Sequence, residues 1–107
     1  MHTQAILIME SEASQPSASW SRLYQVADSY LELGYHLEGT QGFLLGQVLH
    51  PGEAPFPSAQ VTLISPKGTP LQRIETPLHT RFRMAVGPLG KHHLELTLGP
   101  TTFHIPL

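Results

Sequence analysis

The clearest strand signal in this chain is the stretch Ala59-Gln60-Val61-Thr62-Leu63-Ile64-Ser65. Every second residue from Ala59 to Leu63 is apolar, and successive side chains of a strand point to opposite faces of its sheet. One face of this strand is therefore apolar, and it needs a second layer to cover it. The prolines and glycine of residues 66–70 follow directly and predict a turn.

Segments on both sides of this strand repeat its alternation. We predict further strands at residues 4–9, 21–26, 30–38, 43–49, 71–75, 81–86, 92–98 and 102–107, which gives about nine in all. Residues 22–38 can also be read as a helix, because Leu23, Val26, Ala27 and Tyr30 recur at helical spacing. The alternation of Leu31, Leu33, Tyr35 and Leu37 favours strands. Three prolines exclude a central strand at 50–57. Short strands joined by tight turns predict an all-β fold, an antiparallel β-sandwich of transthyretin or immunoglobulin type.

The length of 107 residues fits one domain spanning 1–107. Within it, we expect residues 1–20 to form a strand followed by a flexible arm, because 10–19 is rich in Ser, Ala and Glu. We expect residues 21–107 to form the core of the sandwich.

The composition argues against several classes of protein. There is no cysteine, and the net charge of -2 with six Lys and Arg residues does not suit a nucleic-acid binder. No apolar run approaches the ~20 residues that cross a bilayer, and residues 5–9 are too short for the core of a signal peptide. We therefore expect a cytoplasmic protein that binds no nucleic acid and does not insert into a membrane.

A series of short motifs runs in order from Leu44 to Leu98. They are Gly46-Gln47-Val48 before a Pro-Gly loop, the alternation from Pro57 to Leu63, Gly68 in the next turn, Thr76 before Arg81-Phe82-Arg83-Met84, and Pro88 and Gly90 before His93-Leu94-Glu95-Leu96. In this order and spacing the segment resembles the carboxypeptidase regulatory-like domain, a transthyretin-like sandwich. The chain departs from the family at 77–80, where an acidic residue and a glycine are usual.

The segment before this match, residues 21–49, looks like a bacterial variety of the domain with extra N-terminal strands. The resemblance implies a small, non-enzymatic protein. It also implies an accessory of a bacterial regulatory or signalling system.

Two groups of residues are candidate binding sites. Arg81 and Arg83 share one face of a predicted strand, and Arg73 could lie beside them, which would form a patch for an anion or an acidic partner. The alternative is a solvated face on which Glu75 or Glu95 neutralises the arginines. Trp20, Tyr24 and Tyr30 could form an exposed aromatic platform, although a lone Trp at the start of a strand more often fills a core.

The seven histidines raise the question of a metal site. His93 and His104 would meet if the last two strands form a hairpin about 99–100, with Glu95 nearby. We favour solvent-facing histidines, and we predict neither a metal nor another cofactor.

Nothing in the sequence indicates a catalytic residue. There is no Gly-x-Ser-x-Gly motif, and Asp28, in a predicted turn, is the one aspartate that a Ser-His-Asp triad could use. Glu32 and Glu38 are too far apart along one strand for paired carboxylate chemistry.

We therefore expect a non-enzymatic module that binds another protein through a sheet face or edge. The alternatives are a carbohydrate or small-ligand module that uses Trp20 and Tyr24 and, last, a metal-dependent or hydrolytic enzyme. A homodimer could form through a sheet edge, at strand 4–9 or strand 71–75.

Overall fold

The computed structural model describes residues 2–12, 19–87 and 89–107, and ten strands lie within these ranges. The strands are β1 (His2–Gln4), β2 (Ile6–Glu12), β3 (Trp20–Val26), β4 (Ser29–Glu38), β5 (Gln41–Leu49), β6 (Ser58–Ile64), β7 (Pro70–Pro77), β8 (Phe82–Val86), β9 (His93–Leu98) and β10 (Thr101–Pro106). No helix that could cross a membrane, by its length and apolar character, occurs in these ranges.

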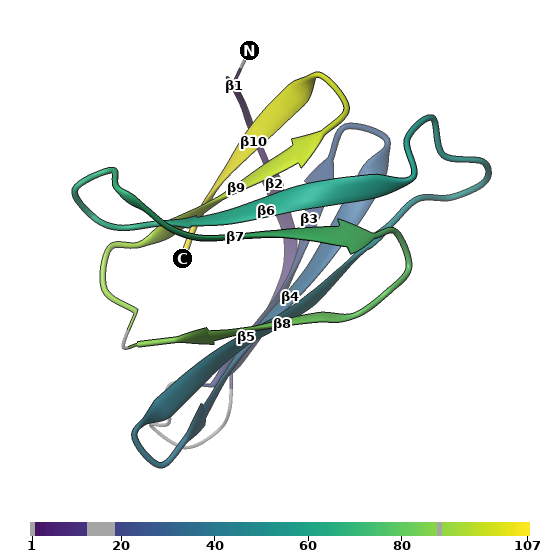
Figure 1. Ribbon diagram of the computed structural model, residues 1–107. Coiled ribbons are helices and arrows are strands. Elements are labelled where there is room, and N and C mark those ends of the chain that lie inside the picture. Colours follow the sequence, from purple (N-terminus) through teal and green to yellow (C-terminus); the bar gives the residue numbers. More distant parts are fainter. Residues whose placement is uncertain (1, 13–18, 88) are drawn as a thin grey trace.

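The strands form two five-stranded sheets that pack face to face (Figure 1). Sheet A has the order β1-β10-β9-β6-β7, and sheet B has the order β2-β3-β4-β5-β8. All the pairings are antiparallel except that of β1 with β10, which is parallel. The predicted all-β sandwich is thus confirmed.

The apolar faces of the two sheets meet in one core. Its buried members are Tyr24, Val26, Leu31, Leu33, Tyr35, Leu44, Val48, Ala59, Val61, Leu63, Phe82, Met84, Val86, Leu94, Leu96, Leu98, Phe103 and Ile105. The alternation that predicted the strand at 59–65 therefore gave the correct inward face. Burying each large side chain of this kind contributes roughly 1.5–3 kcal/mol to folding.

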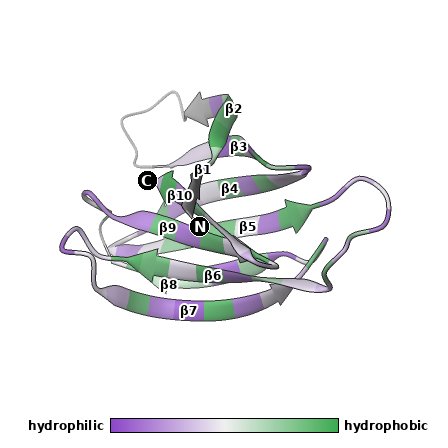
Figure 2. Cartoon of the chain, turned by 90° about the horizontal axis from the view of Figure 1, so that it is seen from above, coloured by the Kyte–Doolittle hydropathy of each residue, from purple (hydrophilic) through white to green (hydrophobic). Residues whose placement is uncertain are grey.

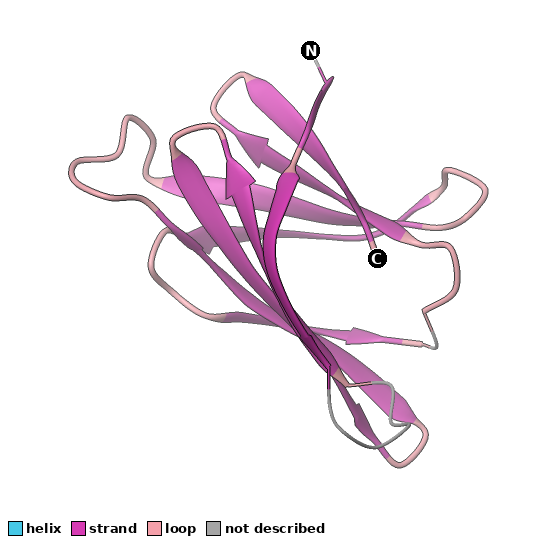
Figure 3. Cartoon of the chain, turned by 180° about the vertical axis from the view of Figure 1, so that it is seen from behind, coloured by secondary structure: helices cyan, strands magenta, loops and turns pink. Residues whose placement is uncertain are grey.

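The N-terminal segment belongs to both sheets. β1 adds to sheet A beside β10, Ala5 donates a backbone hydrogen bond to His104, and β2 then adds to sheet B beside β3. Figure 3 shows this segment passing from one sheet to the other. The single strand predicted at 4–9 is therefore wrong, because the chain changes sheets at Ala5. The predicted arm at 10–19 is also wrong at its start, since β2 extends to Glu12; positions 13–18 lie outside the described residues.

The two sheets do not cover each other over their full length. The far end of the β4–β5 hairpin projects beyond sheet A (Figures 1 and 3), and Leu37, near that end, remains exposed. Four connections cross between the sheets: the passage at Ala5, residues 50–57, residues 78–81 and residues 87–92. The outer face of each sheet is left for solvent or a ligand.

Candidate functional site: a groove on the outer face of sheet B

The two outer faces of the sandwich differ in chemistry. On sheet A, the register places Arg73, Thr62, Glu95 and His104 in one row across four strands. These polar groups contact each other: Arg73 Nε lies 3.4 Å from the Thr62 hydroxyl, and His104 Nε2 lies 3.5 Å from Glu95 Oε2. Within the described residues, the outer face of sheet A is therefore largely polar and satisfies many of its own groups.

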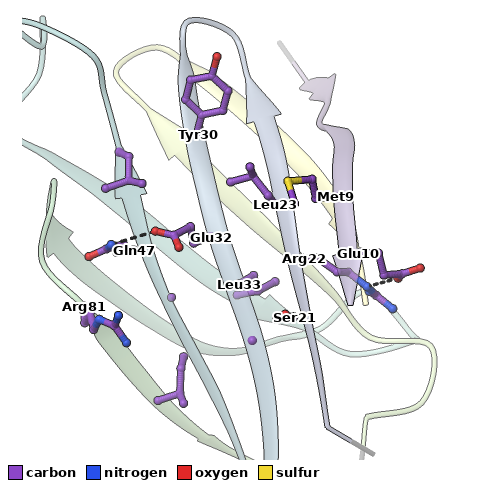
Figure 4. Close-up of a pocket in the computed structure, with 14 residues that line it drawn as sticks. Met9, Glu10, Ser21, Arg22, Leu23, Tyr30, Glu32, Leu33, Gln47 and Arg81 are labelled. Atoms are coloured by element: carbon purple, nitrogen blue, oxygen red, sulfur yellow. Dashed lines mark hydrogen bonds and ion pairs between the residues drawn. The ribbon is translucent and has the colours of Figure 1, made fainter. Parts of the chain in front are cut away.

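The outer face of sheet B is hollowed instead. A groove of about 790 Å³ crosses it from β2 to the start of β8 (Figure 4). Six apolar residues line it: Leu33, which belongs to the core, and Met9, Leu23, Tyr30, Leu45 and Leu49, which do not. Leu45 is 39% exposed and Met9 is 64% exposed, so these side chains present apolar surface to solvent.

The hollow follows from two small residues in one row of the sheet. Ser21 on β3 pairs with Gly34 on β4, and Gly34 pairs with Leu45 on β5. A Cβ atom added to Gly34 would approach nothing closer than 3.6 Å, the distance to the Trp20 carbonyl oxygen. Because Gly34 has no side chain, there is room over the middle of the sheet. No close backbone contact requires glycine at this position.

Polar groups surround the apolar floor. Gln47 Nε2 donates a 3.0 Å hydrogen bond to Glu32 Oε1 across β4 and β5. At the β8 end, Arg81 is exposed and makes no hydrogen bond or ion pair with any residue that the structure describes. Next to it, the Arg83 guanidinium lies 3.9 Å from the centre of the Phe43 ring, a cation–π contact on the same face. The groove thus offers a partner apolar surface with two cations at one end.

A charged and aromatic cluster lies on the inner side of β2 and β3, because Arg22 alternates with the outward-facing Leu23. Arg22 Nε donates to Glu10 Oε2 at 2.7 Å, and its guanidinium lies 4.0 Å from the centre of the Trp20 ring. Trp20 in turn stacks on Tyr35, with ring centres 6.1 Å apart. Burial lowers the pKa of Arg22, but the Tyr24 hydroxyl and the Glu10 carboxylate outweigh it, so that this pKa is raised overall. Arg22 therefore stays charged and fixes β2 to β3.

The structure brings together only some of the predicted binding residues. Arg81 and Arg83 do share one face, as predicted. Arg73 does not join them, because β7 pairs with β6 in sheet A, so the prediction of a three-arginine patch is wrong. Glu75 and Glu95 also lie in sheet A and do not neutralise this pair of arginines.

The predicted aromatic platform does not form. Tyr24 is 4% exposed and belongs to the core, where its hydroxyl lies 3.5 Å from the Pro106 carbonyl oxygen. Trp20 is half-buried against Tyr35. Tyr30 alone of the three lines the groove.

The histidine pair forms as expected from the hairpin of β9 and β10. The ring centres of His93 and His104 are 5.4 Å apart, and Glu95 contacts His104. Among the described residues, however, no group of three or more His, Cys, Asp or Glu side chains is arranged to hold a metal ion.

A serine and a histidine also meet, but on the inner side of the sandwich. Ser29 Oγ lies 2.7 Å from His50 Nδ1, while Ser29 is buried at 2% exposure. Asp28 is exposed in the adjacent turn and has no hydrogen bond to His50. A hydroxyl that a substrate cannot reach is not a nucleophile, so this pair anchors the 50–57 loop to β4.

The sequence analysis missed the apolar residues of the groove. The signal was present in β5, where Phe43, Leu45 and Leu49 are apolar on the outward face while Leu44 and Val48 fill the inward face. In a two-layer fold, a strand that is apolar on both faces indicates that its outer face is an interaction site.

No protein-family model, no curated protein and no solved structure matches this chain.

Proposed function

We propose that this chain is a non-enzymatic protein-interaction module that binds its partner in the groove on the outer face of sheet B. The observation that carries the proposal is the contrast between the two outer faces. The face of sheet A pairs many of its polar groups internally, whereas the groove of sheet B exposes Leu45 near the unpaired Arg81 and Met9 at its other end. Apolar surface next to an unpaired cation is the surface that gains most from a partner.

The partner chemistry follows from the order of side chains across the sheet. One row runs Met9, Leu23, Glu32 and Gln47, and the register of β5 with β8 continues it to Arg81. Five neighbouring strands span about 19 Å, which an extended segment of about six residues covers. The partner therefore presents an extended segment with apolar side chains over Leu23 and Leu45 and a carboxylate at Arg81 and Arg83.

Carbohydrate binding has less support. Sugar platforms need exposed aromatic faces, and in this groove Tyr30 is the one aromatic residue of the lining. Trp20 is stacked on Tyr35 and covered by Arg22. The carboxypeptidase regulatory-like resemblance, and with it a role in a bacterial regulatory system, stays a prediction, as does a cytoplasmic location.

A selection with a displayed library of random peptides tests the proposal. Peptides retained by the immobilised wild-type protein are expected to combine apolar residues with Asp or Glu. Their binding is expected to be lost in Gly34→Val, because the added side chain fills the middle of the groove. A Cβ atom at Gly34 meets only ordinary van der Waals contacts and valine favours strands, so this variant is expected to fold, which circular dichroism checks.

The matched control is Thr62→Val, a substitution to the same residue in the outer row of sheet A. Binding that survives Thr62→Val but not Gly34→Val places the partner in the groove. Retained peptides that bind Gly34→Val as tightly as wild type would overturn the proposed site, and a library that yields no retained peptide would overturn peptide recognition by this module.

A further inference from the structure

Strand β2 is an edge strand with an unusual surface. It lies at the open edge of sheet B, and Ile6, Leu7, Ile8 and Met9 are four consecutive large apolar residues between 45% and 64% exposed. Figure 2 shows β2 at the rim of the molecule with apolar residues along it. The register shift between Leu7 and Met9 makes Ile8 an extra residue. Leu7 then aligns with Tyr24 on the inner side, and Met9 aligns with Leu23 on the outer side, so both faces of β2 are apolar.

The other edge strands carry the features that prevent edge-to-edge pairing. β7 has Pro70 and Pro77 at its ends and exposed Arg73 and Glu75 between them. β8 exposes Arg83, and β1 is three residues long. β2 has a bulge at Ile8, but residues 6–9 contain no charge and no proline. A strand that is apolar on both faces is typical of a sheet interior.

We propose that β2 pairs antiparallel with β2 of a second copy of this chain, joining the two B sheets into one continuous sheet. Within the described residues no strand pairs with the outer edge of β2. A two-fold axis through this edge satisfies the backbone groups of both copies at once, whereas an unrelated partner would satisfy those of one copy. The charges agree with this occupant. The acidic residues of β2, Glu10 and Glu12, both lie at its C-terminal end. Antiparallel pairing places them at opposite ends of the junction, whereas parallel pairing would set them side by side.

The test uses a lysine in the edge strand, the natural protection of such edges. Sedimentation velocity of the full chain over a concentration series is expected to show a monomer–dimer equilibrium. Ile8→Lys is expected to raise the dimer dissociation constant by about tenfold or more, because the pairing buries this side chain. Leu71→Lys, on edge strand β7 and with 51% exposure in the wild type, is the matched control and is expected to leave the constant unchanged.

Because the chain has no cysteine, a single introduced cysteine locates the contact. Ile8→Cys is expected to give a covalent dimer under mild oxidation that Leu71→Cys does not give. A wild-type protein that sediments as a monomer at every concentration would overturn the inference. So would a dimer that dissociates with Leu71→Lys but not with Ile8→Lys. The inference does not depend on the proposed function: Gly34→Val, which blocks the groove, is expected to leave the dimer intact.

Discussion

Ala27 adopts a backbone conformation that is unfavourable for alanine. It lies in the two-residue turn between Val26 and Ser29, which pair with each other, and it has a φ of 59°. A residue with a Cβ atom pays about 1–2 kcal/mol for this left-handed conformation, which glycine adopts freely. His79, with a φ of 63°, adopts the same left-handed conformation.

We predict that Ala27→Gly raises the free energy of unfolding by about 1 kcal/mol, since relief of the strain exceeds the added chain entropy of glycine. Chemical denaturation monitored by Trp20 fluorescence measures the change. Asp28→Gly, in the same turn but without a positive φ, is the control and is expected to give no gain. An equal gain from both would show that the turn, not the φ of Ala27, is responsible.

Gly46 and Gly34 of sheet B differ in the space that a side chain would find. A Cβ atom at Gly46 would lie 2.6 Å from the Phe82 ring and 2.7 Å from the Glu32 carbonyl oxygen, whereas a Cβ atom at Gly34 would meet nothing closer than 3.6 Å. We predict that Gly46→Ala lowers the free energy of unfolding by about 2 kcal/mol or more, because the clash includes backbone. Gly34→Ala is expected to leave it unchanged or raise it. Thermal unfolding of both variants checks this, and similar losses in both would contradict the assignment of Gly34 to a binding groove.

At the scale of elements, the alternation of apolar residues was enough to predict most strands. It did not predict which strands pair with each other in a sheet. The strands around Leu31, Val61, Phe82 and Leu94 carry a buried face that shows in local sequence. Which sheet a short strand joins depends on pairing between distant segments. The sequence around Arg73 therefore could not show that β7 lies in the opposite sheet from β8.

The same limit applies to the groove and to the N-terminal strands. The outward face of β5 is apolar in the sequence, but its use as a groove floor depends on Gly34 and Ser21 in neighbouring strands. The chain changes sheets at Ala5 because β1 pairs with β10, and no local sequence pattern predicts that pairing.

The attachment of β2 to sheet B rests in part on Arg22. Its guanidinium binds Glu10 and covers Trp20, and its side chain is 18% exposed. We predict that Arg22→Ala lowers the free energy of unfolding by about 1–2 kcal/mol and speeds hydrogen exchange in β2. Since the pKa of Arg22 is raised, its contribution is fully present below the ordinary arginine pKa and is lost only as pH rises through the raised value. Unchanged exchange in β2 would show that Arg22 does not hold this strand.

At the scale of the whole molecule, the sandwich is asymmetric between its two outer faces. Sheet A presents rows of paired polar groups, whereas sheet B presents an apolar groove that begins at an apolar edge strand and ends at two arginines. The groove and the β2 edge are adjacent, since Met9 belongs to both. A dimer through β2 would therefore place two grooves on one continuous sheet and allow bivalent binding.

The most direct test of this account compares one charge reversal on each outer face. A retained acidic peptide is titrated against Arg81→Glu and Arg73→Glu by isothermal calorimetry, with circular dichroism to confirm that both variants fold. If the peptide's carboxylate binds Arg81, Arg81→Glu is expected to weaken binding about tenfold or more, while Arg73→Glu binds as wild type does. Equal losses in the two variants would show that only net charge matters. A loss in Arg73→Glu alone would place the binding site on sheet A and contradict binding in the groove of sheet B.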